Sequence, residues 1–80
     1  MSWLISEKDK VLTYTKYFDE LKLFVEIEQN YSQELSFFSS KATREVPGLP
    51  NLDIDAHGWT FYEALDNLLK KAYKSSSATV

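Results

Sequence analysis

The chain contains no cysteine, and its 80 residues include only two glycines and two prolines. Without cysteine there is no disulfide framework, no thiolate metal site and no cysteine nucleophile. The scarcity of glycine and proline indicates few tight turns and therefore long regular elements. A chain of this length buries only a modest part of its surface, so we expect its core to be marginal unless association completes it.

The charge and the length of the apolar runs exclude further classes of protein. The net charge of -3 supplies no basic face for phosphate, so nucleic acid is not an expected partner. No apolar run approaches the roughly 20 residues that span a bilayer, and Met1–Ile5 is too short and uncharged for a signal peptide. We expect a single cytoplasmic domain.

Residues 6–43 contain neither glycine nor proline, as a long helix requires. Ser6, followed by acidic residues, is typical of a helix N-cap. Apolar side chains recur at spacings of three and four, which is typical of one face of an amphipathic helix or coiled coil. They are Tyr14, Phe18, Leu21, Phe24, Ile27, Tyr31, Leu35, Phe38 and Ala42. The pattern predicts one uninterrupted helix over about 6–43.

Val46–Asn51 holds both prolines and one glycine, so we predict a loop over about 44–57. Helical spacing returns afterwards and predicts a second helix over about 58–74, followed by a frayed tail at 75–80. The expected fold is all-α: one long helix, a Pro-containing loop and a second, antiparallel helix. Because the second helix is about half as long as the first, we expect dimerisation to complete this helical hairpin.

Two groups of residues could carry chemistry, and a structural role is the better interpretation of each. Asp53, Asp55 and His57 alternate and supply a partial metal site of three ligands only, so we expect a polar loop edge without metal. Glu26 and Glu28 are two residues apart, so on a helix they face different directions and form no cleft. His57 has no cysteine nucleophile and no Gly-rich turn beside it, so we expect no catalytic residue, no cofactor and no enzyme.

Twelve aromatic side chains, 15% of the residues, are too many for so small an interior. Aromatic residues left at a surface are typical of interaction hot spots. We therefore predict a protein-interaction and dimerisation module whose partner is a second copy or another helical protein. The candidate interaction residues are Tyr14, Tyr17, Phe18, Leu21, Leu23, Trp59 and Tyr62.

Part of the chain resembles a known family. Leu21, the run Val25–Leu35 and Phe38 resemble the N-terminal helix signature of F-BAR (FCH) domains over roughly 17–42, and Phe61–Leu65 resembles the start of that family's second helix. The chain departs from the family in having Phe24 where a basic residue is usual, and in being too short for the further helices. The resemblance implies a dimeric, membrane-associated scaffold, with weak contact to anionic membranes because the first helix is acidic between its lysines.

A function of another class also fits the size and the charge of the chain. A small acidic inhibitor or immunity-type protein binds a basic protein partner and blocks its site. No motif in the sequence points to this alternative. The two functions differ in oligomeric state, because a scaffold is dimeric and an inhibitor of this kind is monomeric.

Overall fold

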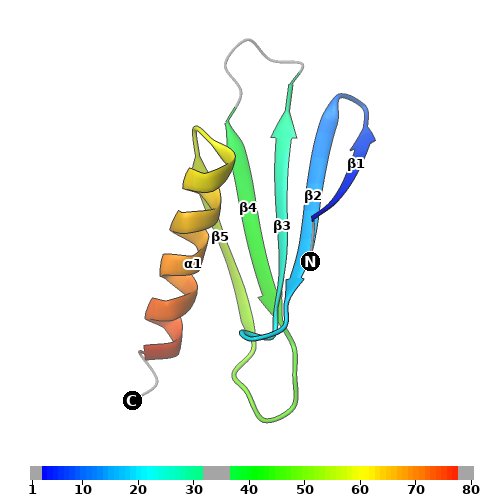
Figure 1. Ribbon diagram of the computed structural model, residues 1–80. Helices are drawn as coiled ribbons and strands as arrows, with labels where there is room; N and C mark the ends of the chain where they lie inside the picture. The colour runs from blue at the N-terminus through cyan, green and yellow to red at the C-terminus, as the bar shows by residue number, and fades with distance from the viewer. Residues whose placement is uncertain (1–2, 32–36, 78–80) are drawn as a thin grey trace.

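The computed structural model describes residues 3–31 and 37–77, which form five strands followed by one helix (Figure 1). Each strand pairs antiparallel with the next, so the sheet has the order β1-β2-β3-β4-β5. The helix packs on one face of this meander. The elements are β1 (Leu4–Lys8), β2 (Val11–Phe18), β3 (Leu23–Asn30), β4 (Phe38–Arg44), β5 (Leu52–Gly58) and α1 (Phe61–Ser77).

The predicted all-α hairpin is wrong. The helix expected over about 6–43 is replaced by β1 to β4, and the loop expected over about 44–57 contains most of β5. The predicted second helix, over about 58–74, corresponds to α1, which begins and ends three residues later and takes in 75–77 of the expected tail. Residues 78–80 of that tail, and Leu35 of the predicted helix, lie outside the described residues.

The segment that resembles an F-BAR domain, roughly 17–42, includes β3 and parts of β2 and β4. A helical, coiled-coil module of the F-BAR type is therefore not supported, and a scaffold function built on long helices fails with it. The acidic-inhibitor alternative gains no support from the fold. Apolar residues in this segment recur at spacings of three and four, but they also recur at every second position. The second pattern is that of a strand, and it is the one that the fold follows.

The strands form because alternate residues are apolar and β-branched or aromatic residues are frequent. In β3 the alternation places Leu23, Val25 and Ile27 on one face, and each is at most 1% exposed. The first two turns contain no glycine: Asp9 and Lys10 adopt φ of 52° and 63° between β1 and β2, and Lys22 adopts 54° between β2 and β3. Such a two-residue turn with two positive φ angles suits a hairpin. A segment without glycine, such as residues 6–43, can therefore form strands joined by tight turns as well as a long helix.

The core lies between the sheet and α1. We call the face that carries Leu23, Val25 and Ile27 the inner face, and the opposite face the outer face. Under α1 the inner face of β4 and β5 presents small side chains, Ala42 and Ala56, which lets the helix approach closely. The helix contributes a row of residues four apart to the same core: Ala64, Leu68 and Ala72.

Gly58 marks the point of closest approach between β5 and α1. A Cβ atom at this position would lie 2.4 Å from the Ala64 backbone nitrogen and 2.9 Å from its Cα. The buried Ser40 hydroxyl donates a hydrogen bond to the Ala64 carbonyl oxygen at 2.9 Å, which fixes the first turn of the helix to β4. The contact between strand backbone and helix backbone therefore requires glycine at the end of β5.

We predict that Gly58→Ala lowers the free energy of unfolding by roughly 1–3 kcal/mol, because the new methyl group overlaps the helix backbone. Asp53→Ala, on the exposed outer face of the same strand, is the control and should change it by less than about 0.5 kcal/mol. Urea denaturation followed by circular dichroism measures both. Equal stabilities of the two variants would contradict this packing.

Candidate functional site

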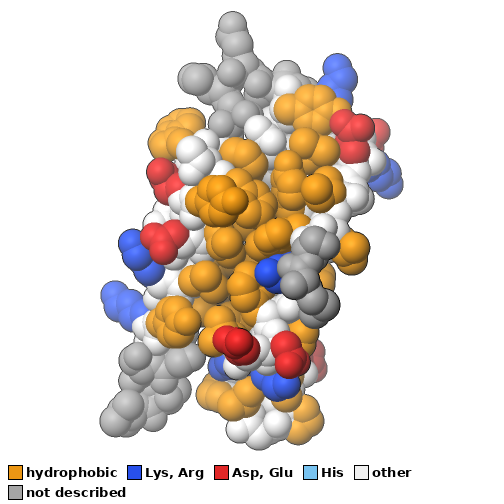
Figure 2. Space-filling model, viewed as in Figure 1, with side chains coloured by type: hydrophobic (Ala, Val, Ile, Leu, Met, Phe, Trp, Pro, Cys, Tyr) orange, Lys and Arg blue, Asp and Glu red, His pale blue; other side chains and the backbone are white. Residues whose placement is uncertain are grey.

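One half of the inner face is not covered by the helix. Within the described part of the chain, α1 contacts β5 and β4 extensively and β3 slightly, and it has no contact of comparable extent with β1 or β2. Figure 2 shows apolar side chains gathered over the middle of this face, beside the helix. We call the inner-face apolar residues of β1 and β2, together with Trp3, the open surface. They are Trp3, Ile5, Leu12, Tyr14 and Phe18.

Aromatic rings connect the open surface to the start of the helix. Phe61, the first residue of α1, makes edge-to-face contacts with Trp3 and Tyr14 at centroid distances of 5.1 and 5.0 Å. Trp3 also meets Phe18 at 5.9 Å, and the Lys16 ammonium lies 5.0 Å from the Phe18 centroid. Such ring pairs and cation–π contacts stabilise a partly exposed surface. Trp3, Tyr14 and Phe18 of the open surface are thus held by contacts with one another or with Phe61.

The predicted interaction residues do not form one surface. Tyr14 and Phe18 lie partly buried at the open half of the inner face, and Leu21, in the turn between β2 and β3, packs against the core. Tyr17 lies on the outer face opposite Phe24.

Three further predicted positions lie elsewhere. Leu23 is buried in the core, so its replacement by a charge would unfold the domain. Trp59 and Tyr62 are exposed at the start of α1. Ile5 was not among the predicted residues, although two adjacent aliphatic residues, Leu4 and Ile5, near an end of the chain were a signal for it.

The two edges of the sheet differ. At the β5 edge, side chains of α1 donate hydrogen bonds to backbone carbonyls of the strand: Asn67 to His57 at 2.8 Å, and Lys71 to Asp55 at 2.5 Å. The two donors are four residues apart on the helix, and the two acceptors are two residues apart on the strand. Both separations are about 6 Å, so each donor lies beside one acceptor. Carbonyls two residues apart point to the same edge of a strand, so α1 occupies successive acceptors of β5.

The β1 edge has no such cover among residues 3–31 and 37–77. β1 pairs with β2 on one side, and no described helix or strand lies on its other side. Leu4 and Ile5 are 75% and 63% exposed. The Tyr31 hydroxyl donates a hydrogen bond to the Glu7 carboxylate, which raises the pKa of Tyr31 because the neutral hydroxyl is the donor. An uncovered edge strand with exposed aliphatic residues is a template for pairing with another chain.

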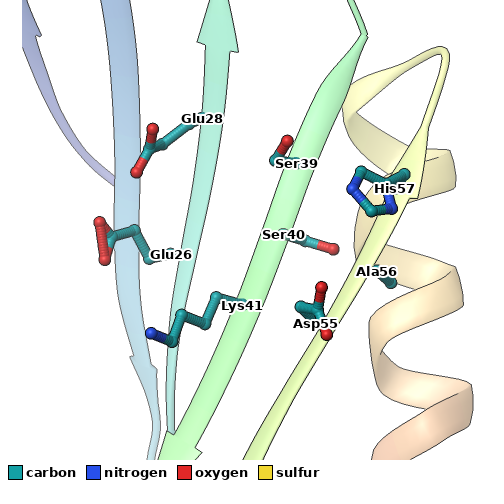
Figure 3. A pocket seen from close by; sticks show the side chains of 8 residues that line it. All are labelled: Glu26, Glu28, Ser39, Ser40, Lys41, Asp55, Ala56 and His57. Atoms are coloured by element: carbon teal, nitrogen blue, oxygen red, sulfur yellow. The ribbon is translucent and has the colours of Figure 1, made fainter.

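The outer face carries the exposed rings of Tyr17 and Phe24 on β2 and β3, and elsewhere across β3, β4 and β5 it is polar. A hollow of about 380 Å³ extends across β3, β4 and β5. Figure 3 shows its lining side chains, among which Glu26, Lys41 and Asp55 are cross-strand neighbours. Glu28, Ser39 and His57 form the next row. Opposite charges in neighbouring strands stabilise a sheet, which gives the first row a structural role.

The prediction about the directions of Glu26 and Glu28 is wrong. Both share the outer face, contrary to the prediction that they face different directions, because side chains two apart in a strand point the same way. Asp53, Asp55 and His57 also share the outer face, along β5. Within the described ranges, no group of three or more His, Asp or Glu side chains is placed to hold a metal ion.

Comparisons with protein-family models, with curated proteins and with solved structures give no match to this chain. Over the part of the chain that the structure covers, no helix has both the length and the apolarity needed to cross a membrane. The absence of catalysis, of metal and of nucleic-acid binding, and the weak contact with anionic membranes, stay predictions.

We predict that the double variant Asn67→Ala, Lys71→Ala exposes the β5 edge and increases the amount of high-molecular-weight assembly. Each lost hydrogen bond should also lower the free energy of unfolding by about 0.5–1.5 kcal/mol. Lys70→Ala is the matched control, since Lys70 pairs with Asp66 on the helix itself. Light scattering after size-exclusion chromatography measures the assembly, and identical profiles for the two variants would show that α1 does not protect this edge.

Proposed function

We propose that the protein is a non-catalytic interaction module that forms a homodimer by pairing β1 with β1 of a second copy. The observation that carries the proposal is the difference between the two edges. Helix side chains occupy the carbonyls of β5, whereas β1 is uncovered and exposes Leu4 and Ile5. A strand of a second copy satisfies the backbone groups of such an edge and removes it from solvent.

The backbone groups available for pairing follow from the hairpin. The two-residue turn at Asp9–Lys10 makes Lys8 and Val11 a hydrogen-bonded pair. Ser6 and Leu4, two and four residues before Lys8, therefore direct their backbone groups toward β2. Ile5 and Glu7 direct theirs away from β2 and supply the donors and acceptors for a partner strand.

Two-fold symmetry then selects the register. An isologous antiparallel pair keeps the two inner faces on one side of the joined sheet, so inner-face residues oppose each other. With Glu7 on the axis, two carboxylates would be opposed, which is unfavourable. With Ser6 on the axis, each Ile5 would oppose a Glu7 carboxylate, which pairs an apolar side chain with a charge. With Ile5 on the axis, the two apolar Ile5 side chains meet. We therefore infer a continuous ten-stranded sheet centred on Ile5, in which the two open surfaces become neighbours.

The exposure of β1 is consistent with a missing partner, because Leu4 and Ile5 are 75% and 63% exposed. Apolar side chains at the β1 edge provide the driving force once they leave water.

We predict that Ile5→Lys and Ile5→Glu each convert the dimer to a monomer, because each places two like charges against one another on the two-fold axis. Ile5 is 63% exposed, so both variants should fold as the unmodified chain does. An equimolar mixture of the two variants should restore the dimer, since Lys then faces Glu. Sedimentation velocity over a dilution series measures all three samples.

Leu49→Lys is the control for this experiment. Leu49 is an exposed aliphatic residue in the loop between β4 and β5, so its replacement should leave the dimer intact. A monomeric unmodified chain would overturn the proposal. A mixture of Ile5→Lys and Ile5→Glu that stays monomeric would overturn the register centred on Ile5.

A further inference from the structure

A second exposed aromatic surface lies at the opposite edge of the sheet, where β5 ends and α1 begins. A hollow of about 320 Å³ is lined there by Phe37, His57, Gly58, Trp59 and Glu63. Trp59 is 67% exposed and Phe37 43% exposed. None of these residues belongs to the open surface or to β1, so binding at this hollow does not depend on dimerisation.

Local structure brings the walls of the hollow together. Phe38 pairs with Gly58 across β4 and β5, so the preceding Phe37 reaches His57, and the two rings lie 5.5 Å apart at 59°. The chain then leaves β5 and enters α1 through a capping box. In this box the Trp59 N–H donates to Glu63 Oε1 at 3.0 Å, and the Glu63 N–H donates to Thr60 Oγ1 at 3.1 Å. These bonds hold the Trp59 backbone and the Glu63 carboxylate at the same rim.

The chemistry of these walls favours a cation. Faces of aromatic rings carry negative electrostatic potential and attract cations, and Trp is the most effective of them. The Glu63 carboxylate adds a full negative charge and offsets the positive end of the helix dipole. The net charge of the chain, -3, also favours a cationic ligand over an anionic one.

The type of cation follows from the hydrogen-bonding groups. A primary ammonium has three donors to satisfy. The lining offers such donors only the His57 ring and the Glu63 carboxylate, whose Oε1 already accepts the Trp59 N–H, while the rings of Phe37 and Trp59 supply no acceptor atom. A quaternary ammonium has no N–H donor and is weakly hydrated, so it loses little on entering an aromatic hollow. We propose that the hollow formed by Phe37, His57, Trp59 and Glu63 binds a methylated, quaternary ammonium group.

The test compares choline with 3,3-dimethyl-1-butanol, its neutral isostere, by following the Trp59 indole N–H signal in NMR titrations. We expect saturable binding of choline and none of the isostere. Glu63→Gln keeps an acceptor for the capping box but removes the charge, so it should weaken choline binding about fivefold. Trp59→Ala, followed on the backbone amide signals near His57, should abolish binding. Tyr73→Ala, at an exposed ring on the last turns of α1, should leave it unchanged.

The opposite results would overturn the proposal. They are the absence of saturable choline binding, equal binding of the neutral isostere, or unchanged affinity in Trp59→Ala or in Glu63→Gln. Trimethyllysine and phosphocholine, titrated in the same way, distinguish a modified side chain from a lipid headgroup as the source of the group. Preferential binding of either one supports the same chemistry, and failure of both along with choline refutes it.

Discussion

The structure depends on how one helix packs on a sheet that is too wide for it. Gly58, Ala56 and Ala42 leave room for the helix backbone, and Ala64 sits directly against that surface. This close contact draws α1 toward β4 and β5 and away from β1. Because the helix cannot cover both halves of five strands, its position decides which half forms the core and which half meets solvent or a partner.

The same placement gives the two edges of the sheet different properties. From its position over β5, α1 places Asn67 and Lys71 within reach of two carbonyls at that edge, which accept their hydrogen bonds. On the other side α1 makes no comparable contact with the described residues of β1, and Phe61 contacts only the rings of Trp3 and Tyr14 beside it. The proposed dimerisation rests on this difference between the covered and the uncovered half of the inner face.

The candidate site could be predicted from the sequence only in part. The surplus of aromatic residues correctly indicated exposed rings, and Trp59 and Tyr62 are among them. The role of Leu23 could not be predicted, because its position in the core depends on pairing with Phe18 across a turn that contains no glycine. Glu26 and Glu28 illustrate the same difficulty, since a helix would separate their side chains and the strand aligns them.

The sequence by itself determined the composition of the surface: an acidic chain, without disulfides, with more aromatic residues than its interior accommodates. It also contained the signals that start α1, namely Thr60 and Glu63 three residues apart. Tertiary structure decided between helix and strand over residues 6–43, because spacings of three and four coexist there with alternation of two. The alternation prevailed through pairing with distant strands and burial under α1, and both are non-local interactions that a local pattern does not contain.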